Sequence, residues 1–66
     1  MRITVNGDAV EMKDDATLID LLLQLSLGDA RVAIELNGDI VPRSQHEQQP
    51  LQDGDTLEIV HAIGGG

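Results

Sequence analysis

Residues 17–27 read TLIDLLLQLSL and carry the strongest structural signal in the chain. Four leucines follow the i, i+3, i+4, i+7 pattern that lines one side of an α-helix: Leu18, Leu21, Leu22 and Leu25. Thr17 is a suitable N-cap, and Gly28 suits the left-handed position that follows a helix. We therefore expect one helix over about residues 17–27, with its leucine stripe facing a sheet.

Short stretches of alternating apolar residues surround this helix and predict strands. The clearest are residues 2–6, 9–13, 32–36 and 56–62. Asn6-Gly7 separates the first two, and Asn37-Gly38 follows the third; Asn-Gly is typical of a two-residue hairpin turn. Ile40-Val41 is expected to form a very short strand ended by Pro42, which cannot donate a hydrogen bond to a sheet.

The segment before the last strand is polar. Ser44 and Glu47 have the spacing of a capping box, which predicts one helical turn that Pro50 closes. His46 lies in this turn and His61 lies near the end of the last strand. Neither histidine has a metal-ligand partner at a suitable spacing, so both are expected to be solvated, and no metal site is predicted.

The order of these elements predicts an α+β fold. Two hairpins that flank one helix, followed by a late strand, suggest a mixed sheet of about five strands packed on the helix. The last strand should lie parallel beside the first, in the centre, because Val60 and Ala62 add apolar residues to its second face. Residues 1–63 are expected to form one domain, and residues 64–66 a flexible tail.

Composition excludes several classes of function. The 66 residues contain 12 acids and 4 bases, for a net charge of −8, so nucleic acid and anionic membranes are not expected as partners. There are no cysteines and no aromatic residues, which excludes disulfides, thiolate metal sites and aromatic ligand boxes. The acidity fits either a basic protein partner or simple solubility. No targeting or transmembrane segment is evident, so a cytoplasmic location is expected.

The last three residues, Gly64, Gly65 and Gly66, follow a strand and have no turn to make. One interpretation is a frayed terminus. The other is an accessible C-terminal carboxylate on a tail that enters a narrow cleft, where any Cβ would collide. No serine has an adjacent base and no carboxylate pair calls for catalysis, so the chain is not expected to be an enzyme by itself.

Three segments resemble one known family. They are residues 37–43 (NGDIVPR), the Asp53-Gly54-Asp55 turn and the ending Ile63-Gly64-Gly65-Gly66. Together with the order of elements, they make the whole chain similar to the ThiS family. Its members are ubiquitin-like β-grasp proteins that carry sulfur for the thiazole ring of thiamine.

The resemblance implies a function as a protein co-substrate. An E1-like (ThiF-like) adenylating enzyme would use ATP and magnesium to activate the carboxylate of Gly66, and a persulfide donor would convert it to a thiocarboxylate. Thiazole synthase (ThiG-like) would receive the sulfur, while Gly64 and Gly65 thread the partners' active sites. The carrier itself would bind no cofactor and provide no catalytic residue.

A partner surface is expected beside the tail. Ala33, Val60 and Ala62 form a small apolar strip on the sheet face away from the helix, with Ile63 at the root of the tail. An ordinary exposed strip is the alternative. Three other functions stay open: a sulfur carrier for molybdopterin, a ubiquitin-like protein modifier, and a non-catalytic β-grasp interaction module.

Overall fold

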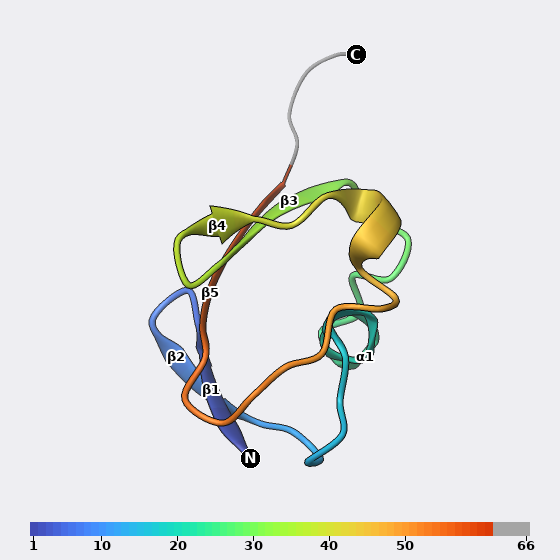
Figure 1. Ribbon diagram of the computed structural model, residues 1–66. Helices are drawn as coiled ribbons and strands as arrows, with labels where there is room; N and C mark the ends of the chain where they lie inside the picture. The colour runs from blue at the N-terminus through green and yellow to red at the C-terminus, as the bar shows by residue number, and fades with distance from the viewer. Residues whose placement is uncertain (62–66) are drawn as a thin grey trace.

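Five strands form one mixed sheet in the order β2-β1-β5-β3-β4 (Figure 1). The computed structural model describes residues 1–61. Its elements are β1 Arg2–Val5, β2 Asp8–Glu11, α1 Leu18–Gln24, β3 Val32–Leu36, β4 Asp39–Ile40, the 3-10 helix η1 Arg43–Gln45 and β5 Thr56–His61. β5 lies parallel to β1 and antiparallel to β3, so the prediction of a central last strand is confirmed.

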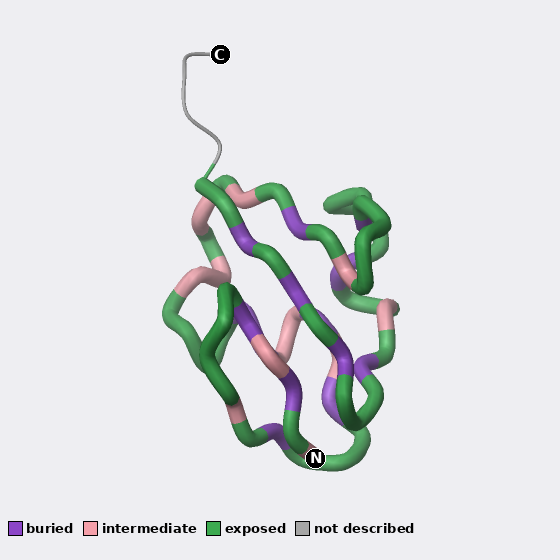
Figure 2. Tube along the Cα trace, turned by 90° about the vertical axis from the view of Figure 1, so that its left-hand side faces the viewer, coloured by how far each residue is buried: buried purple, intermediate pink, exposed green. Residues whose placement is uncertain are grey.

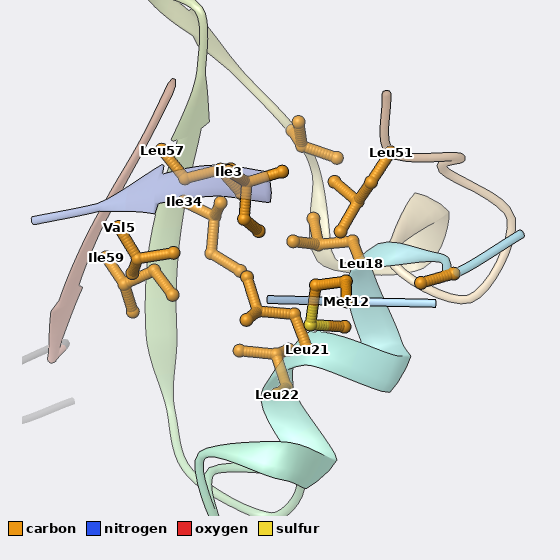
Figure 3. Packing of buried hydrophobic residues seen from close by; sticks show 12 residues of the cluster. Ile3, Val5, Met12, Leu18, Leu21, Leu22, Ile34, Leu51, Leu57 and Ile59 are labelled. Atoms are coloured by element: carbon orange, nitrogen blue, oxygen red, sulfur yellow. The ribbon is translucent and has the colours of Figure 1, made fainter. Parts of the chain in front are cut away.

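The helix α1 covers one face of this sheet (Figure 1). Its buried residues, Leu18, Leu21 and Leu22, point toward Ile34 and the other buried side chains of the sheet (Figure 3). Alternation along β1, β3 and β5 supplies the sheet's share of the core, which includes Ile3, Val5, Ile34, Leu57 and Ile59. The opposite sheet face, called the outer face below, is not covered by α1.

The N-terminus of α1 is capped by side chains as the sequence predicts. Thr17 is the N-cap residue in an extended conformation. Its N–H donates to Asp20 Oδ2 at 2.9 Å, and its hydroxyl donates to the same oxygen at 3.2 Å. The N–H bond from Thr17 holds the pKa of the Asp20 carboxyl below its ordinary value. Asp20 therefore stabilises this helix end at neutral pH, and the contribution is lost as the pH falls through that lowered pKa.

The C-terminus of α1 differs from the prediction. The left-handed residue is Ser26, with φ 61°, and not Gly28. Ser26 N–H donates to the Leu23 carbonyl at 3.1 Å and Leu27 N–H to the Leu22 carbonyl at 2.6 Å, the two bonds of a Schellman motif. The helix thus stops at Gln24, and Leu25 is exposed instead of continuing the stripe.

Gly28 has a different role. A Cβ at this position would lie 2.7 Å from Leu23 Cδ2, so the glycine makes room for a close approach of that side chain.

The segment around η1 also corrects two predictions. Its N-cap is Pro42 and no side chain caps it, so Ser44 does not form a capping box. His46 is not solvated, because only 5% of its surface is exposed. Its Nε2 lies 3.1 Å from the Val41 carbonyl, and its own carbonyl accepts the N–H of Ile19 at 3.1 Å. Since a carbonyl only accepts, Nε2 carries the hydrogen, and the histidine links the residue after β4 to the start of α1.

Candidate functional site

β5 is the strand that leads to the terminal glycines, and both of its neighbours hold it. Five of its residues pair with β3 and two pair with β1. Beyond the last β1 pair, the side-chain amide of Asn6 continues the ladder. Its Oδ1 accepts the N–H of Ile59 at 2.8 Å and its Nδ2 donates to the Ile59 carbonyl at 3.0 Å. The chain is therefore held on both sides as far as Ile59, and by β3 as far as His61.

The start of β5 is held from its other side. Asn37 Oδ1 accepts the N–H of Thr56 at 2.9 Å, and Asn37 Nδ2 donates to Asp55 Oδ1 at 2.9 Å. The second oxygen of Asp55 accepts the N–H of Gln52 at 2.8 Å. Asp55 is a buried carboxylate, and these bonds replace the water that it loses on folding.

The outer face carries two of the predicted docking residues. Ala33 and Val60 are register partners across β3 and β5, and both are exposed, Val60 by 58%. Buried and exposed residues alternate along most of β5 (Figure 2). The structure therefore confirms that they lie side by side away from α1. The other docking residues, Ala62 and Ile63, and the tail residues Gly64, Gly65 and Gly66 lie outside the described residues 1–61.

Sequence reasoning missed further residues on this face. Ile40 of β4 is 68% exposed and pairs with Glu35 of β3, which in turn faces Glu58 of β5. The signal was available in principle. A two-residue Asn37-Gly38 loop sets the register of its hairpin, and that register places Ile40 opposite Glu35.

The opposite edge of the outer face carries a neutralised pair. Arg2 Nε lies 2.7 Å from Glu11 Oε1 across β1 and β2, and this hydrogen bond raises the pKa of the Arg2 guanidinium above its ordinary value. Both side chains are largely exposed, so the pair contributes little to folding. On the outer face, the β2–β1 side therefore pairs a positive with a negative charge, whereas the β3–β5 side holds two negative charges, Glu35 and Glu58.

The described residues offer no constellation for catalysis or metal binding. Residues 1–61 hold no group of three or more histidines, cysteines or acids placed to bind a metal ion. His61 is exposed, as expected. A hollow of about 140 Å³ lies on the helix side, with Leu22 and His46 in its wall, away from the outer face. None of the helices in residues 1–61 combines the length and apolar character needed to cross a bilayer.

These features define a class of protein. A mixed five-stranded sheet packed on one helix, with the last strand in the centre and parallel to the first, is the architecture of a ubiquitin-like β-grasp protein.

Similarity to known proteins narrows this class to one family. Residues 3–66 match the model of the ThiS family. The sulfur carrier protein ThiS of Escherichia coli (strain K12) is 38% identical over 66 residues, which cover 100% of both chains. A crystal structure of the thiamine biosynthesis protein ThiS from Geobacter metallireducens aligns with a TM-score of 0.85 at 32% identity, covering 100% of both chains. The chain belongs to the ThiS family.

A longer relative is also similar. The thiazole synthase of Paramagnetospirillum magneticum (strain ATCC 700264 / AMB-1) is 41% identical over 66 residues. These residues cover 100% of this chain but only 20% of that relative. The chain thus spans about a fifth of the thiazole synthases that it matches.

Proposed function

We propose that this protein is the sulfur carrier for the thiazole ring of thiamine, and that it acts as a co-substrate of other enzymes and not as a catalyst. The observation that carries the proposal is the full-length match to a protein named as the sulfur carrier ThiS. The fold agrees, since a thiamine biosynthesis protein of the same family shares it over the whole chain.

The proposed chemistry takes place at the carboxylate of Gly66. A carboxylate is a poor electrophile, so an E1-like adenylating enzyme joins it to the α-phosphate of ATP, with magnesium, and releases pyrophosphate. A persulfide sulfur then attacks the acyl carbon and AMP leaves. Cleavage of the S–S bond, with two electrons from a thiol reductant, leaves a thiocarboxylate on Gly66. This chain supplies the carboxylate, and its partners supply ATP, magnesium and sulfur.

Thiazole synthase is the proposed acceptor of this sulfur. The support is that chains named thiazole synthase contain a stretch similar to all 66 residues of this protein. A carrier and an acceptor that occur in one polypeptide are kept close together, as a direct sulfur transfer needs.

The proposed contribution of the fold is to position the end of β5, and the residues that follow it, for the partner enzymes. β5 is held on both sides as far as Ile59, by Asn6 and by β3, and by β3 as far as His61, so the described end of the strand has a defined place on the domain. Gly64 and Gly65 are proposed to thread the active site of each partner, where side chains would collide. The apolar pair Ala33 and Val60, continued by Ala62 and Ile63, is proposed to dock the partner's surface.

Pyrophosphate exchange tests the role of Gly66. The assay uses the ThiF-like enzyme of the same organism with wild-type protein, a Gly66 deletion and Gly65→Val. The deletion withdraws the carboxylate by about 3.5 Å, and displacements of about 1 Å can lower rates about a hundredfold. We expect exchange to collapse for both variants while their thermal midpoints stay at the wild-type value. Near-normal exchange by the deletion protein would overturn the proposal.

A second assay separates thiazole formation from other sulfur pathways. Purified thiocarboxylate protein is mixed with thiazole synthase and its other substrates, and intact mass is followed. We expect the protein to lose one sulfur and regain one oxygen as thiazole product appears. Product formation without this mass change would point to another sulfur donor.

Val60→Glu tests the docking strip. The side chain is exposed, so the folding free energy should change by less than about 0.5 kcal/mol. Binding to the adenylating enzyme should weaken, because a charge would be buried against an apolar surface. Equal affinities for the two proteins would remove Val60 from the docking strip.

A further inference from the structure

Two large apolar side chains on the outer face are exposed and lie outside the buried core. Ile40 is 68% exposed and Val60 is 58% exposed. They lie on different strands, β4 and β5, which are the two neighbours of β3 in the sheet. Single exposed hydrophobic residues are common on soluble proteins, so a contact surface here depends also on the charged residues between these two.

Two carboxylates lie between these apolar residues. Glu35 and Glu58 are register partners on β3 and β5, and both point outward because the next pair along, Ile34 and Ile59, is buried. The main-chain groups of successive residues in a strand point to opposite sides. The N–H and C=O of Ile59 bond to Asn6 on the β1 side, so the N–H and C=O of Glu58 face β3. In an antiparallel sheet, directly opposite residues have Cβ atoms about 5 Å apart.

This pair is unfavourable for folding. Like charges directly opposite each other destabilise a sheet, whereas the β1–β2 pair Arg2 and Glu11 is neutralised at 2.7 Å. Among residues 1–61, neither the Glu35 nor the Glu58 side chain forms a hydrogen bond or an ion pair. The fold therefore gives no reason for two negative charges at this place.

We propose that the surface formed by Ile40, Glu35, Glu58 and Val60 binds an arginine of the adenylating enzyme, with apolar side chains of that enzyme over Ile40 and Val60. This inference rests on the proposed sulfur-carrier function. A guanidinium is planar, presents several donors and is weakly hydrated, so it can bond to both carboxylates and relieve their repulsion.

The position of the surface agrees with this partner. Glu58 lies eight residues before Gly66, which is at most about 29 Å of extended chain. An enzyme that holds the Gly66 carboxylate in its active site therefore has its own surface within reach of β5. Two of the negative charges behind the net charge of −8, those of Glu35 and Glu58, would then make a specific contact with the enzyme in addition to long-range steering.

A matched pair of substitutions tests the carboxylates. Glu58→Gln and Glu11→Gln each remove one negative charge from the outer face, so their effects on general steering are equal. We expect Glu58→Gln to raise the Kd for the adenylating enzyme about fivefold or more, and Glu11→Gln to change it by less than about twofold. Glu58→Lys should raise the Kd further while its thermal midpoint equals or exceeds that of wild type, since the introduced ammonium group would face the Glu35 carboxylate.

A second matched pair tests the apolar part. Ile40 and Leu23 are similarly exposed, at 68% and 62%, but Leu23 lies on α1. Ile40→Ser should weaken binding about fivefold or more, and Leu23→Ser should leave it within about twofold. Both proteins should stay folded, because neither side chain belongs to the buried core.

The outcomes separate this inference from the proposed function. If wild-type protein supports no pyrophosphate exchange, the carrier function fails. If wild-type protein supports exchange but Glu58→Gln and Ile40→Ser bind like wild type, the surface assignment alone is wrong. Equal losses for Glu58→Gln and Glu11→Gln would also overturn it, because they would show that only the total charge matters.

Discussion

The two Asn-Gly-Asp turns of this protein share their sequence and their conformation but not their partners. Asn6 and Gly7 have φ angles of 51° and 88°, and Asn37 and Gly38 have 51° and 91°. Two consecutive residues with positive φ are the signature of a type I′ turn. Each turn joins adjacent strands, β1 to β2 and β3 to β4.

Their side chains hold opposite sides of β5. The amide of Asn6 bonds to both main-chain groups of Ile59 on the β1 side. The amide of Asn37 accepts the N–H of Thr56 on the β3 side and donates to the buried carboxylate of Asp55. Identical local sequence therefore sets the turn, and the neighbouring strand decides what the side chain binds.

The largest difference between the two turns should follow from Asn37→Asp. This substitution keeps the acceptor for Thr56 but places a second carboxylate against Asp55. We expect a loss of about 3 kcal/mol at pH 7, since a buried charge loses a donor and gains a like-charged neighbour. Urea denaturation at pH 7 measures this loss. A loss no larger than that of Asn6→Asp would contradict the placement of Asn37 beside Asp55.

The same substitution at the first turn, Asn6→Asp, should have a smaller effect. Only the donor to the Ile59 carbonyl is lost, and within residues 1–61 no acidic side chain is bonded to Asn6. We expect a loss of about 1.5 kcal/mol. Because aspartate tolerates positive φ about as well as asparagine, turn conformation cancels between the two variants. Losses of equal size would show that the partners on β5 do not matter.

Gly7→Ala and Gly38→Ala should destabilise the protein by equal amounts, in contrast to the two asparagine substitutions. A Cβ at either position would meet nothing within 4 Å, so the effect is purely conformational. Each substitution should cost about 1 kcal/mol, because alanine is strained at positive φ. The comparison of interest is between the two values, measured in the same denaturant. A difference above about 0.5 kcal/mol would mean that the turns are not locally equivalent.

The smallest effect should come from Ser26→Gly and should have the opposite sign. Ser26 is the third non-glycine residue with positive φ, but within residues 1–61 its hydroxyl bonds to nothing, in contrast to the two asparagine amides. Glycine relieves the strain at the end of α1 and also makes the unfolded chain more flexible. We expect a net gain of about 0.5 kcal/mol in unfolding free energy. A loss would show that the Ser26 side chain has a stabilising contact.

The predictable parts of the fold and site depend on neighbours in sequence. Alternation of apolar residues located the strands, Asn6-Gly7 and Asn37-Gly38 located both hairpins, and Thr17 located the helix start. On the outer face, alternation also placed Ala33 and Val60 correctly. In each case the deciding interaction lies within a few residues, or follows from the period of two in a strand.

The incorrect predictions concern one histidine ring and the end of the helix. The polar surroundings of His46 in the sequence predict a solvated ring, yet the ring is buried and its Nε2 bonds to the Val41 carbonyl. The end of α1 was assigned to Gly28, but the packing of residues 22–27 put Ser26 in the left-handed position instead.

The starts of the strands, turns and helix follow from the amino-acid sequence, because backbone propensity and apolar spacing act over a few residues. Which side chains face each other across strands depends on the assembled sheet. It paired Glu35 with Glu58 beside Ile40, and joined Asn6 to Ile59 and Asn37 to Asp55. The physical reason is that register and strand order bring together residues up to 53 positions apart. Charge repulsion, desolvation and hydrogen bonding then act between groups that no local pattern connects.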